Sequence, residues 1–347
     1  MRLILLSLTI VVSLLGGCAS VHGGPDLDSV AFMRTSQQRS AVELSKDDAH
    51  YYAVRAVPFA RVATHVYCQY HEKNDSKQDI IEDCATFPAI SKAGWVELYD
   101  WREVLTDDDK QTGLEFMAFG RASSGVLGDI IIGFRGTDFT SLSDWRSNLR
   151  WFTRFLPLPG KDQYQVVHSR STELIDLALS RAKEKFPSAS GFEVYTTGHS
   201  LGGGLATLLA FSDYRVKGAV VFDPSPVTGY STLVTNSQVN CSARIVRIYE
   251  RGEALQYVRS VLRHFYSLSA NITEISFDLL HARGNPIANH SMADFRGGLE
   301  ARADVRSGTP VPVRELPGQP DCLCYRDRHP DNPAAEASKF CSSIEGQ

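Results

Sequence analysis

The sequence predicts an α/β fold class, in which a mostly parallel central sheet is flanked by helices within a single main domain. Two long segments carry apolar residues at helical spacing, and several short apolar runs bounded by turn residues have the pattern of strands. Beyond residue 190, strand-like and helix-like segments alternate. When a helix connects two strands of one sheet, the two strands usually lie parallel. The alternation of strands and helices therefore favours a parallel sheet.

The predicted elements follow a polar N-terminal stretch. The first is a helix from Asp48 to Tyr70, in which apolar residues recur at helical spacing. A second helix, from Leu174 to Phe186, ends at Pro187, which cannot continue it. The other expected elements are, in order, strands at Gly94 to Val104, Gly113 to Gly120, Gly128 to Gly133 and Phe192 to Thr197, a helix at Gly202 to Phe211, and strands at Lys217 to Phe222 and Arg244 to Tyr249.

The overall composition is that of an ordinary folded protein. Of the 347 residues, 43% are hydrophobic and 22% are charged, so the chain can bury one large core. The net charge is -4 and Lys and Arg are scattered, so we expect no nucleic-acid partner. The expected parts are a signal peptide at 1–17, a tether at 18–47, the main domain at 48–305 and a Cys-containing tail at 306–347. The sequence does not indicate an oligomeric state.

The N-terminus has the pattern of a secretory signal. Arg2 precedes an apolar run from Leu3 to Leu15, which is too short to cross a bilayer as a helix. The run ends in Leu-Gly-Gly-Cys18, which resembles the lipobox of bacterial lipoproteins. That resemblance implies cleavage before Cys18, acylation of that cysteine and a stable membrane anchor. Ala19 stands where an Asp would favour the inner membrane, so we expect an outer-membrane lipoprotein of the cell envelope.

The remaining cysteines form an even set, which suits disulfides in a chain that leaves the cytoplasm. They are Cys68, Cys84, Cys241, Cys322, Cys324 and Cys341. Cys68 and Cys84 bracket a polar loop and are the first candidate pair, although the sequence does not fix the connectivity. Cys322-x-Cys324 lacks a second cysteine pair at zinc-finger spacing, so we predict no metal site there.

A candidate nucleophile lies between a predicted strand and a predicted helix. Gly198-His199-Ser200-Leu201-Gly202 has the pattern of the nucleophile elbow of α/β-hydrolases, in which a strained turn lifts the serine hydroxyl above the sheet. The backbone N–H of Leu201 would face the developing oxyanion. The alternative interpretation is that these residues form a glycine-rich turn with no catalytic role.

A second motif lies upstream, where a buried strand ends in Phe134-Arg135-Gly136-Thr137. With the elbow, this motif resembles the class 3 lipases, the fungal-type family, whose strand ends in Phe-Arg-Gly followed by Thr or Ser. The resemblance implies an α/β-hydrolase fold and implies that Thr137 donates its backbone N–H to the oxyanion. Arg135 is expected to bond loop carbonyls. The resemblance extends over about Asp48 to Arg302.

The segment from Asp138 to Gln163 is amphipathic. It interleaves arginines with large apolar residues, namely Trp145, Trp151, Phe152, Phe155, Leu156 and Leu158. In class 3 lipases this position carries a lid over the active site. Aromatic residues at helical spacing also form ordinary core, so both interpretations stay open.

A serine nucleophile needs a histidine base, and in this fold the chain order is serine, acid, histidine. After Ser200 the candidates are His264, His281, His290 and His329. His290 begins a helix-like segment after the last strand-like run, as the resemblance implies for the catalytic histidine, and is our prediction.

Two residues compete for the role of the acid. Glu253 takes the family's Asp position in the turn after the Arg244 to Tyr249 strand, although Gln256 stands where Pro is usual. Asp223, which follows the preceding strand, is the runner-up, because some hydrolases take their acid from that strand.

These residues predict a serine hydrolase that cleaves carboxylic esters of lipids by two-step acyl transfer, with no cofactor. Its partners would be the ester substrate and the membrane that holds its anchor. The alternatives are a short-chain esterase or amidase, and a catalytically silent envelope lipoprotein that binds a partner.

Overall fold

A computed structural model of the chain describes residues 30–38, 40–74, 90–136, 162–226, 239–256, 259–260, 268–280, 286, 288–306, 308–313 and 315–318, with side chains omitted for 68–74. Its centre is a nine-stranded sheet in the order β2-β1-β9-β8-β7-β6-β5-β4-β3. The strands are β1 (Phe32–Arg34), β2 (Val42–Glu43), β3 (Val96–Asp100), β4 (Phe116–Arg121), β5 (Leu127–Phe134), β6 (Gly191–His199), β7 (Val216–Phe222), β8 (Arg244–Glu250) and β9 (Ile272–Phe277).

The middle of the sheet is parallel and its two edges are antiparallel. Strands β5, β6, β7, β8 and β9 pair in parallel. β3 and β4 add antiparallel strands at one edge, and β1 and β2 do so at the other. The predicted α/β fold class is therefore confirmed, with a mixed sheet whose five central strands are parallel. The alternating strands and helices after residue 190 form its parallel core.

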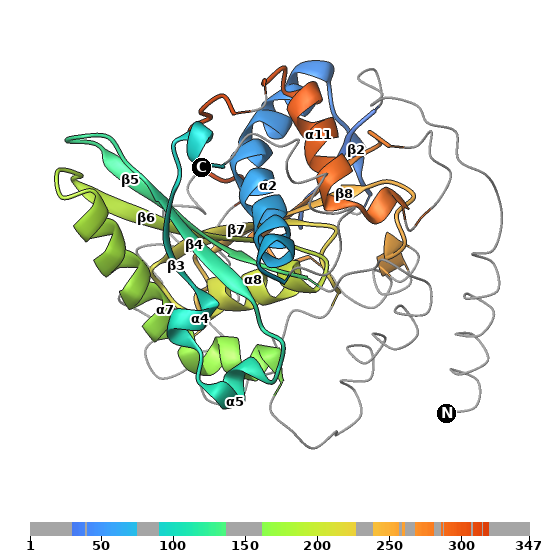
Figure 1. The fold of residues 1–347 in the computed structure, drawn as a ribbon. Coiled ribbons are helices and arrows are strands. Elements are labelled where there is room, and N and C mark those ends of the chain that lie inside the picture. Colours follow the sequence, from blue (N-terminus) through green and yellow to red (C-terminus); the bar gives the residue numbers. More distant parts are fainter. Residues whose placement is uncertain are drawn as a thin grey trace, which may run out of the picture.

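Helices cover both faces of the sheet (Figure 1). α7 (Gln163–Lys185) and α8 (Leu201–Ser212) pack on one face, while α2 (Lys46–Asn74) and α11 (Met292–Arg302) pack on the other. Successive residues of β5 alternate between the two cores. Ile130 and Ile132 pack with the α7 and α8 side, and Ile131 packs with the α2 and α11 side. Because side chains alternate along a strand, one fully apolar run supplies both layers.

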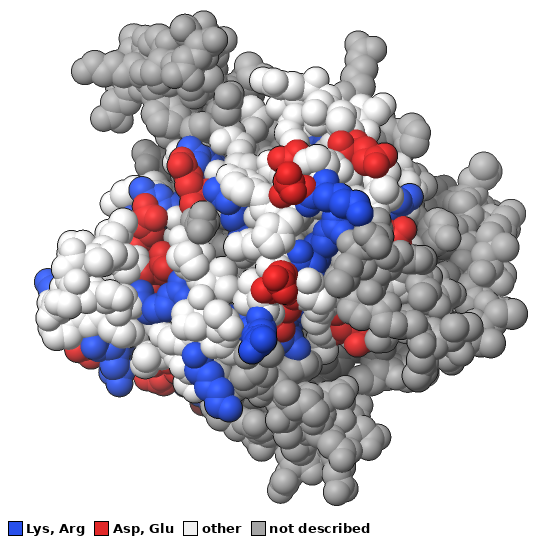
Figure 2. Space-filling model, turned by 90° about the horizontal axis from the view of Figure 1, so that it is seen from above, with Lys and Arg blue, Asp and Glu red and all other residues white. Residues whose placement is uncertain are grey.

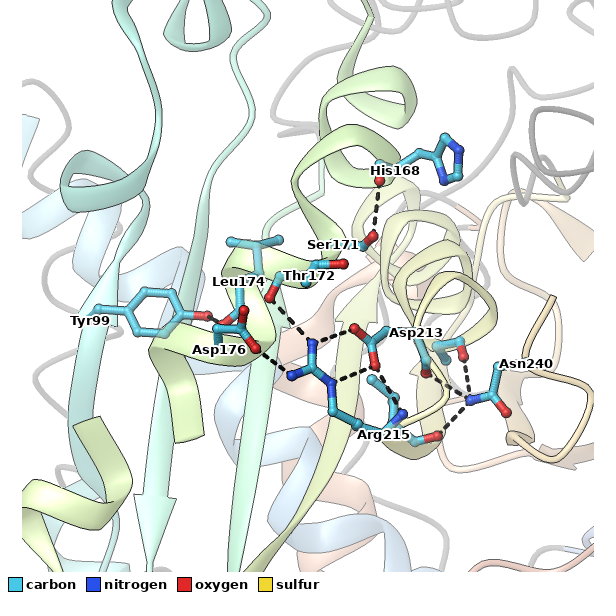
Figure 3. A network of polar contacts seen from close by, with 11 residues as sticks. Tyr99, His168, Ser171, Thr172, Leu174, Asp176, Asp213, Arg215 and Asn240 are labelled. Carbon is cyan, nitrogen blue, oxygen red and sulfur yellow. Dashed lines mark hydrogen bonds and ion pairs between the residues drawn. The ribbon is translucent and has the colours of Figure 1, made fainter. Parts of the chain in front are cut away.

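A polar network ties the α7 and α8 layer to the start of β7 (Figure 3). The Arg215 guanidinium donates to both carboxylate oxygens of Asp213 and also contacts Asp176 of α7. The Asn240 amide donates to the carbonyls of Ala210, Asp213 and Val216. The network closes the end of α8, where backbone carbonyls need partners.

A buried ionic cluster joins the helices of the opposite layer. Glu300 of α11 accepts from Arg61 Nε of α2 at 2.6 Å and from Arg296 Nη1 on its own helix. All three side chains are buried. Arg61 also donates to the carbonyls of Arg306 and Thr309, so the start of the tail is held against α2.

Two predicted elements differ most in extent from the structure. The run predicted as one strand from Gly94 to Val104 is β3 followed by the helix α4 (Trp101–Val104). The Asp100 side chain accepts from Arg102 N at 2.8 Å, and this N-cap starts the helix and ends the strand. The helix predicted from Leu174 begins earlier, at Gln163, because Asp162 and Gln165 form a capping box.

Parts of the predicted tether and of the predicted tail pack with the main domain. Part of the expected tether forms β1 and β2, and β1 extends the sheet by pairing with β9. These strands are short, so a polar stretch without a sustained period did not reveal them. In the tail, Val311 and Leu316 are buried in the α2 and α11 layer.

Basic and acidic side chains lie interspersed on the face shown in Figure 2. Neither sign of charge gathers into one field there. In the part of the chain that the structure describes, no helix is both long and apolar enough to span a bilayer. The predicted aromatic lid segment, except for Asp162 and Gln163, lies outside the described residues, and so does Cys18.

Candidate active site

Ser200 occupies a strained turn between β6 and α8. Its φ of 55° and ψ of -123° lie where few residues other than glycine are found. The backbone is held there from both sides, since Ser200 N donates to Phe222 O at 3.0 Å and Ser225 N donates to Ser200 O at 2.9 Å. Such strain persists only where the surrounding structure imposes it, and it is concentrated at functional sites. Ser200 is 1% exposed.

Leu201 is the first residue of α8, so its backbone N–H belongs to the positive end of that helix. The elbow lies tightly against the turn that follows β5. A Cβ on Gly202 would lie 2.2 Å from the carbonyl oxygen of Phe134 and 2.9 Å from Gly136 N. Only glycine permits this approach, which brings the helix start beside the turn expected to supply the second oxyanion donor. That donor, Thr137, lies outside the described residues.

Tyr67 of α2 joins the same turn to the elbow. Its hydroxyl oxygen accepts the backbone N–H of Gly136 at 3.0 Å and lies 3.3 Å from Nδ1 of His199. A Cβ on Gly136 would lie 2.4 Å from both the Tyr67 hydroxyl and the carbonyl oxygen of His199. Arg135 pairs with the carboxylate of Glu115 at 2.9 Å, a partner that the sequence did not predict.

His290 lies beside the elbow, at the end of η4 (Ala288–His290). Its ring centroid is 4.5 Å from that of His199, the residue before Ser200. His290 Nδ1 and Oε2 of Glu253 are 2.8 Å apart, and both side chains are buried. Because an ionised carboxylate only accepts, Nδ1 carries the proton and Nε2 has the lone pair that a general base requires.

The Glu253 carboxylate is held by several donors. Oε2 accepts from Leu255 N at 2.7 Å as well as from His290, and Oε1 accepts from the buried Arg259 guanidinium. Arg259 also stacks over the Tyr249 ring, with Cζ 4.1 Å from the centroid. Burial raises the pKa of Glu253, but Arg259 and His290 outweigh burial, so the pKa lies below its ordinary value. Glu253 is therefore ionised.

Asp223, the other candidate acid, lies nearby in a different environment. Its Oδ1 accepts from Glu250 N at 2.9 Å and lies 3.9 Å from Arg259, while His290 Nδ1 is bonded to Glu253. Its φ is 39°, another strained backbone angle for a residue other than glycine. Burial and the neighbouring charge of Glu253 raise the pKa of Asp223. The two carboxyl groups thus have pKa values pushed apart, which is typical of active sites.

The geometry places the His290 and Glu253 pair beside His199, the residue before Ser200, and it also brings in residues for which the sequence carried no functional signal. Tyr67 lies in an apolar helix pattern, and Arg259 lies in a segment that reads as an amphipathic surface. His199 fills the variable position of the elbow motif. The other histidine candidates, His264, His281 and His329, lie outside the described residues.

Comparison with known proteins gives one family match. The family model described as Lipase (class 3) matches residues 131–232, from β5 through the elbow to just beyond β7. This is less than a third of the chain, and it does not reach Glu253 or His290. The chain is therefore similar to class 3 lipases over the segment that holds Ser200. No curated protein sequence matches.

Two solved lipase structures are similar at a low level. Lipase II from Rhizopus niveus has 13% identity and a TM-score of 0.33, covering 67% of this chain and 79% of that chain. M37 lipase has 12% identity and a TM-score of 0.26, covering 79% and 84%. The strand order and the strained elbow after β6 give the α/β-hydrolase fold, in a single domain.

Proposed function

We propose that the protein is a serine hydrolase that cleaves carboxylic esters of lipids through an acyl-enzyme on Ser200. The observation that carries the proposal is the strained Ser200 turn beside the buried His290 and Glu253 pair. The family match over the nucleophile segment supports the same reaction class.

In the proposed mechanism, Nε2 of His290 takes the proton of the Ser200 hydroxyl as its oxygen attacks the ester carbonyl. Glu253 holds the imidazole by Nδ1 and stabilises the imidazolium that forms. The oxyanion is stabilised by the N–H of Leu201 and, as we propose, by that of Thr137. His290 then protonates the leaving alcohol, and water releases the acid by the reverse sequence. This route uses no cofactor.

The similarity to class 3 lipases supports a lipid substrate. The alternative is that the protein is a short-chain esterase or an amidase. The test is a series of rates on acyl esters of increasing chain length, measured below and above the concentration at which they form an interface. A rise in rate at the interface supports a lipase. High rates confined to short soluble esters, or to amides, contradict the lipid proposal.

The hydrolase proposal itself is tested at Ser200. Ser200→Ala should lower ester hydrolysis by at least about 10⁴-fold and abolish labelling by a fluorophosphonate probe, with little change in Tm. His290→Ala should fall as low, because members of a triad act as one unit. Turnover retained by a folded Ser200→Ala protein, or no labelling of the wild type, would overturn the proposal and favour a silent binding protein.

We further propose that Cys18 is acylated and anchors the protein in the cell envelope, at the outer membrane. A signal-like N-terminus supports this location. The even set of six further cysteines, which suits disulfides, supports an oxidising compartment. Wild-type protein should incorporate a labelled fatty acid and sediment with outer membranes, whereas Cys18→Ala should do neither. Membrane association unchanged in Cys18→Ala would refute the anchor.

A further inference from the structure

Three potential metal ligands converge beside the elbow. His199 ends β6, Asp223 follows β7 and His290 ends η4, so three separate elements supply them. Each offers one ligand atom, and the three atoms lie within 4.8 Å of one another. The side chains are almost fully buried, at 4%, 0% and 5% exposure.

Hydrogen bonds on the far side of each side chain identify which atoms face the common point. Nδ1 of His290 is bonded to Glu253 and Nδ1 of His199 lies 3.3 Å from the Tyr67 hydroxyl, so we assign Nε2 of each ring as its ligand atom. Oδ1 of Asp223 accepts from Glu250 N, which leaves Oδ2. Metal-binding histidines usually donate their other ring N–H to a carboxylate or another acceptor. The His290 and Glu253 pair has that arrangement.

Two of these inward atoms are unusual for the interior of a protein. Within the described part of the chain, no hydrogen-bond partner reaches Nε2 of His199 or Oδ2 of Asp223. A buried polar atom without a partner costs about 1–3 kcal/mol, so two of them at one point need an explanation. A shared positive ion would satisfy both. The strained φ of Asp223 shows that the fold holds this carboxyl in place against a backbone preference.

We propose that His199, Asp223 and His290 form a binding site for one divalent zinc-type cation, and that the bound ion reversibly inhibits the hydrolase. Two imidazoles and one carboxylate are a ligand set that suits zinc, whereas magnesium and calcium prefer oxygen ligands alone. The inhibition rests on the proposed function, because the ion takes the Nε2 lone pair with which His290 would deprotonate Ser200. Binding itself does not depend on that function.

The site favours reversible binding over a permanent structural ion. Zinc bonds to nitrogen and oxygen are about 2.0–2.2 Å long, so ligand atoms on one ion lie at most about 4 Å apart. Atoms separated by up to 4.8 Å must therefore move inward by several tenths of an ångström. Arg259, which lies 3.9 Å from Oδ1 of Asp223, repels a second cation, while the Glu253 carboxylate offsets part of that repulsion.

Binding is tested on the full chain with Ser200→Ala, which removes catalysis but none of the three ligands. The protein is stripped with a chelator and titrated with zinc chloride against a chromogenic competitor, with magnesium chloride as the comparison. We expect one zinc ion per chain and no competition by magnesium. Asp223→Asn and, separately, His199→Gln should each weaken zinc binding by at least about 10-fold. His168→Gln, a change of the same kind on α7 outside the cluster, should not.

Inhibition is tested on the otherwise wild-type chain by the rate at which a fluorophosphonate labels Ser200. Zinc should slow labelling, a chelator should restore it, and Asp223→Asn should need at least about 10-fold more zinc. Absence of saturable zinc binding, or binding that both folded ligand variants leave unchanged, overturns the site. Zinc binding without slower labelling overturns the inhibition. A wild type that binds zinc but is never labelled refutes the proposed hydrolase and leaves the metal site standing.

Discussion

The hydroxyl oxygen of Tyr67 accepts the backbone N–H of Gly136 at 3.0 Å, so a helix from the N-terminal part of the domain holds the turn that follows β5. The same oxygen lies 3.3 Å from Nδ1 of His199, next to the proposed nucleophile. One side chain therefore connects the two backbone segments from which oxyanion donors are expected. A donor misplaced by a fraction of an ångström loses much of its effect on the transition state.

Tyr67→Phe should lower kcat about 10-fold and leave KM nearly unchanged. The substitution keeps the ring and removes only the hydroxyl, which in the folded protein contributes about 0.5–1.5 kcal/mol per hydrogen bond. The readouts are kcat, KM and the rate of fluorophosphonate labelling. Tyr51→Phe is the matched control, because Tyr51 is exposed on the same helix. An equal fall of kcat in both variants, or a rise of KM alone, would contradict a positioning role for Tyr67.

The contrast between Glu253 and Asp223 predicts unequal effects of neutralising each carboxyl group. Glu253→Gln should lower kcat by about 10³–10⁴-fold, since the amide cannot stabilise the imidazolium of His290. Asp223→Asn should cost at least about 10-fold less, because Asp223 Oδ1 accepts from Glu250 N whereas Nδ1 of His290 is bonded to Glu253. The test compares kcat/KM of the two variants in metal-free buffer. A larger loss in Asp223→Asn would make Asp223 the acid.

A residue of the site could be predicted from the sequence when the pattern that identifies it lies within a few neighbouring positions. The Ser200 elbow needs glycines within two positions on either side, so a short motif captures it. His290 and Glu253 are separated by 37 positions, and only the expected chain order and the resemblance to class 3 lipases pointed to them. Their hydrogen bond depends on the loop after β8 and on η4 meeting at one end of the sheet.

What the sequence did not reveal depends on contacts between distant segments. Tyr67 is 69 positions from Gly136, and nothing in its helix distinguishes it from an ordinary buried tyrosine. Similarly, β1 is too short to show a period, and its place in the sheet is set by pairing with β9. α4 replaced the end of a predicted strand because one carboxylate, that of Asp100, caps its first turn.

Arg259 should act on the reaction through Glu253. Its guanidinium lies against the carboxylate that holds His290, so Arg259→Met would leave that carboxylate buried with fewer partners. We expect kcat to fall about 10-fold or more, with partial rescue in Arg259→Lys. Arg251→Met is the control, since Arg251 is partly exposed and pairs weakly with Asp278 at 3.8 Å. Equal activity of Arg259→Met and the wild type would show that Leu255 N and His290 suffice to hold Glu253.

The buried cluster between α2 and α11 predicts a large effect on stability that is separate from catalysis. Glu300 bonds both Arg61 and Arg296, and all three side chains are buried. Glu300→Ala would leave two guanidinium groups inside the protein without their shared anion. Removing one partner of a buried ion pair typically costs about 3–5 kcal/mol.

Glu315→Ala is the matched control for that change. Glu315 also pairs with an arginine, Arg244, but its side chain is 79% exposed. Exposed pairs contribute less than about 1 kcal/mol, so this variant should unfold at nearly the denaturant concentration of the wild type. Urea unfolding of both variants gives the comparison. If Glu300→Ala loses no more stability than Glu315→Ala, then water or a rearranged α11 compensates the two arginines, and the cluster does not hold the two helices together.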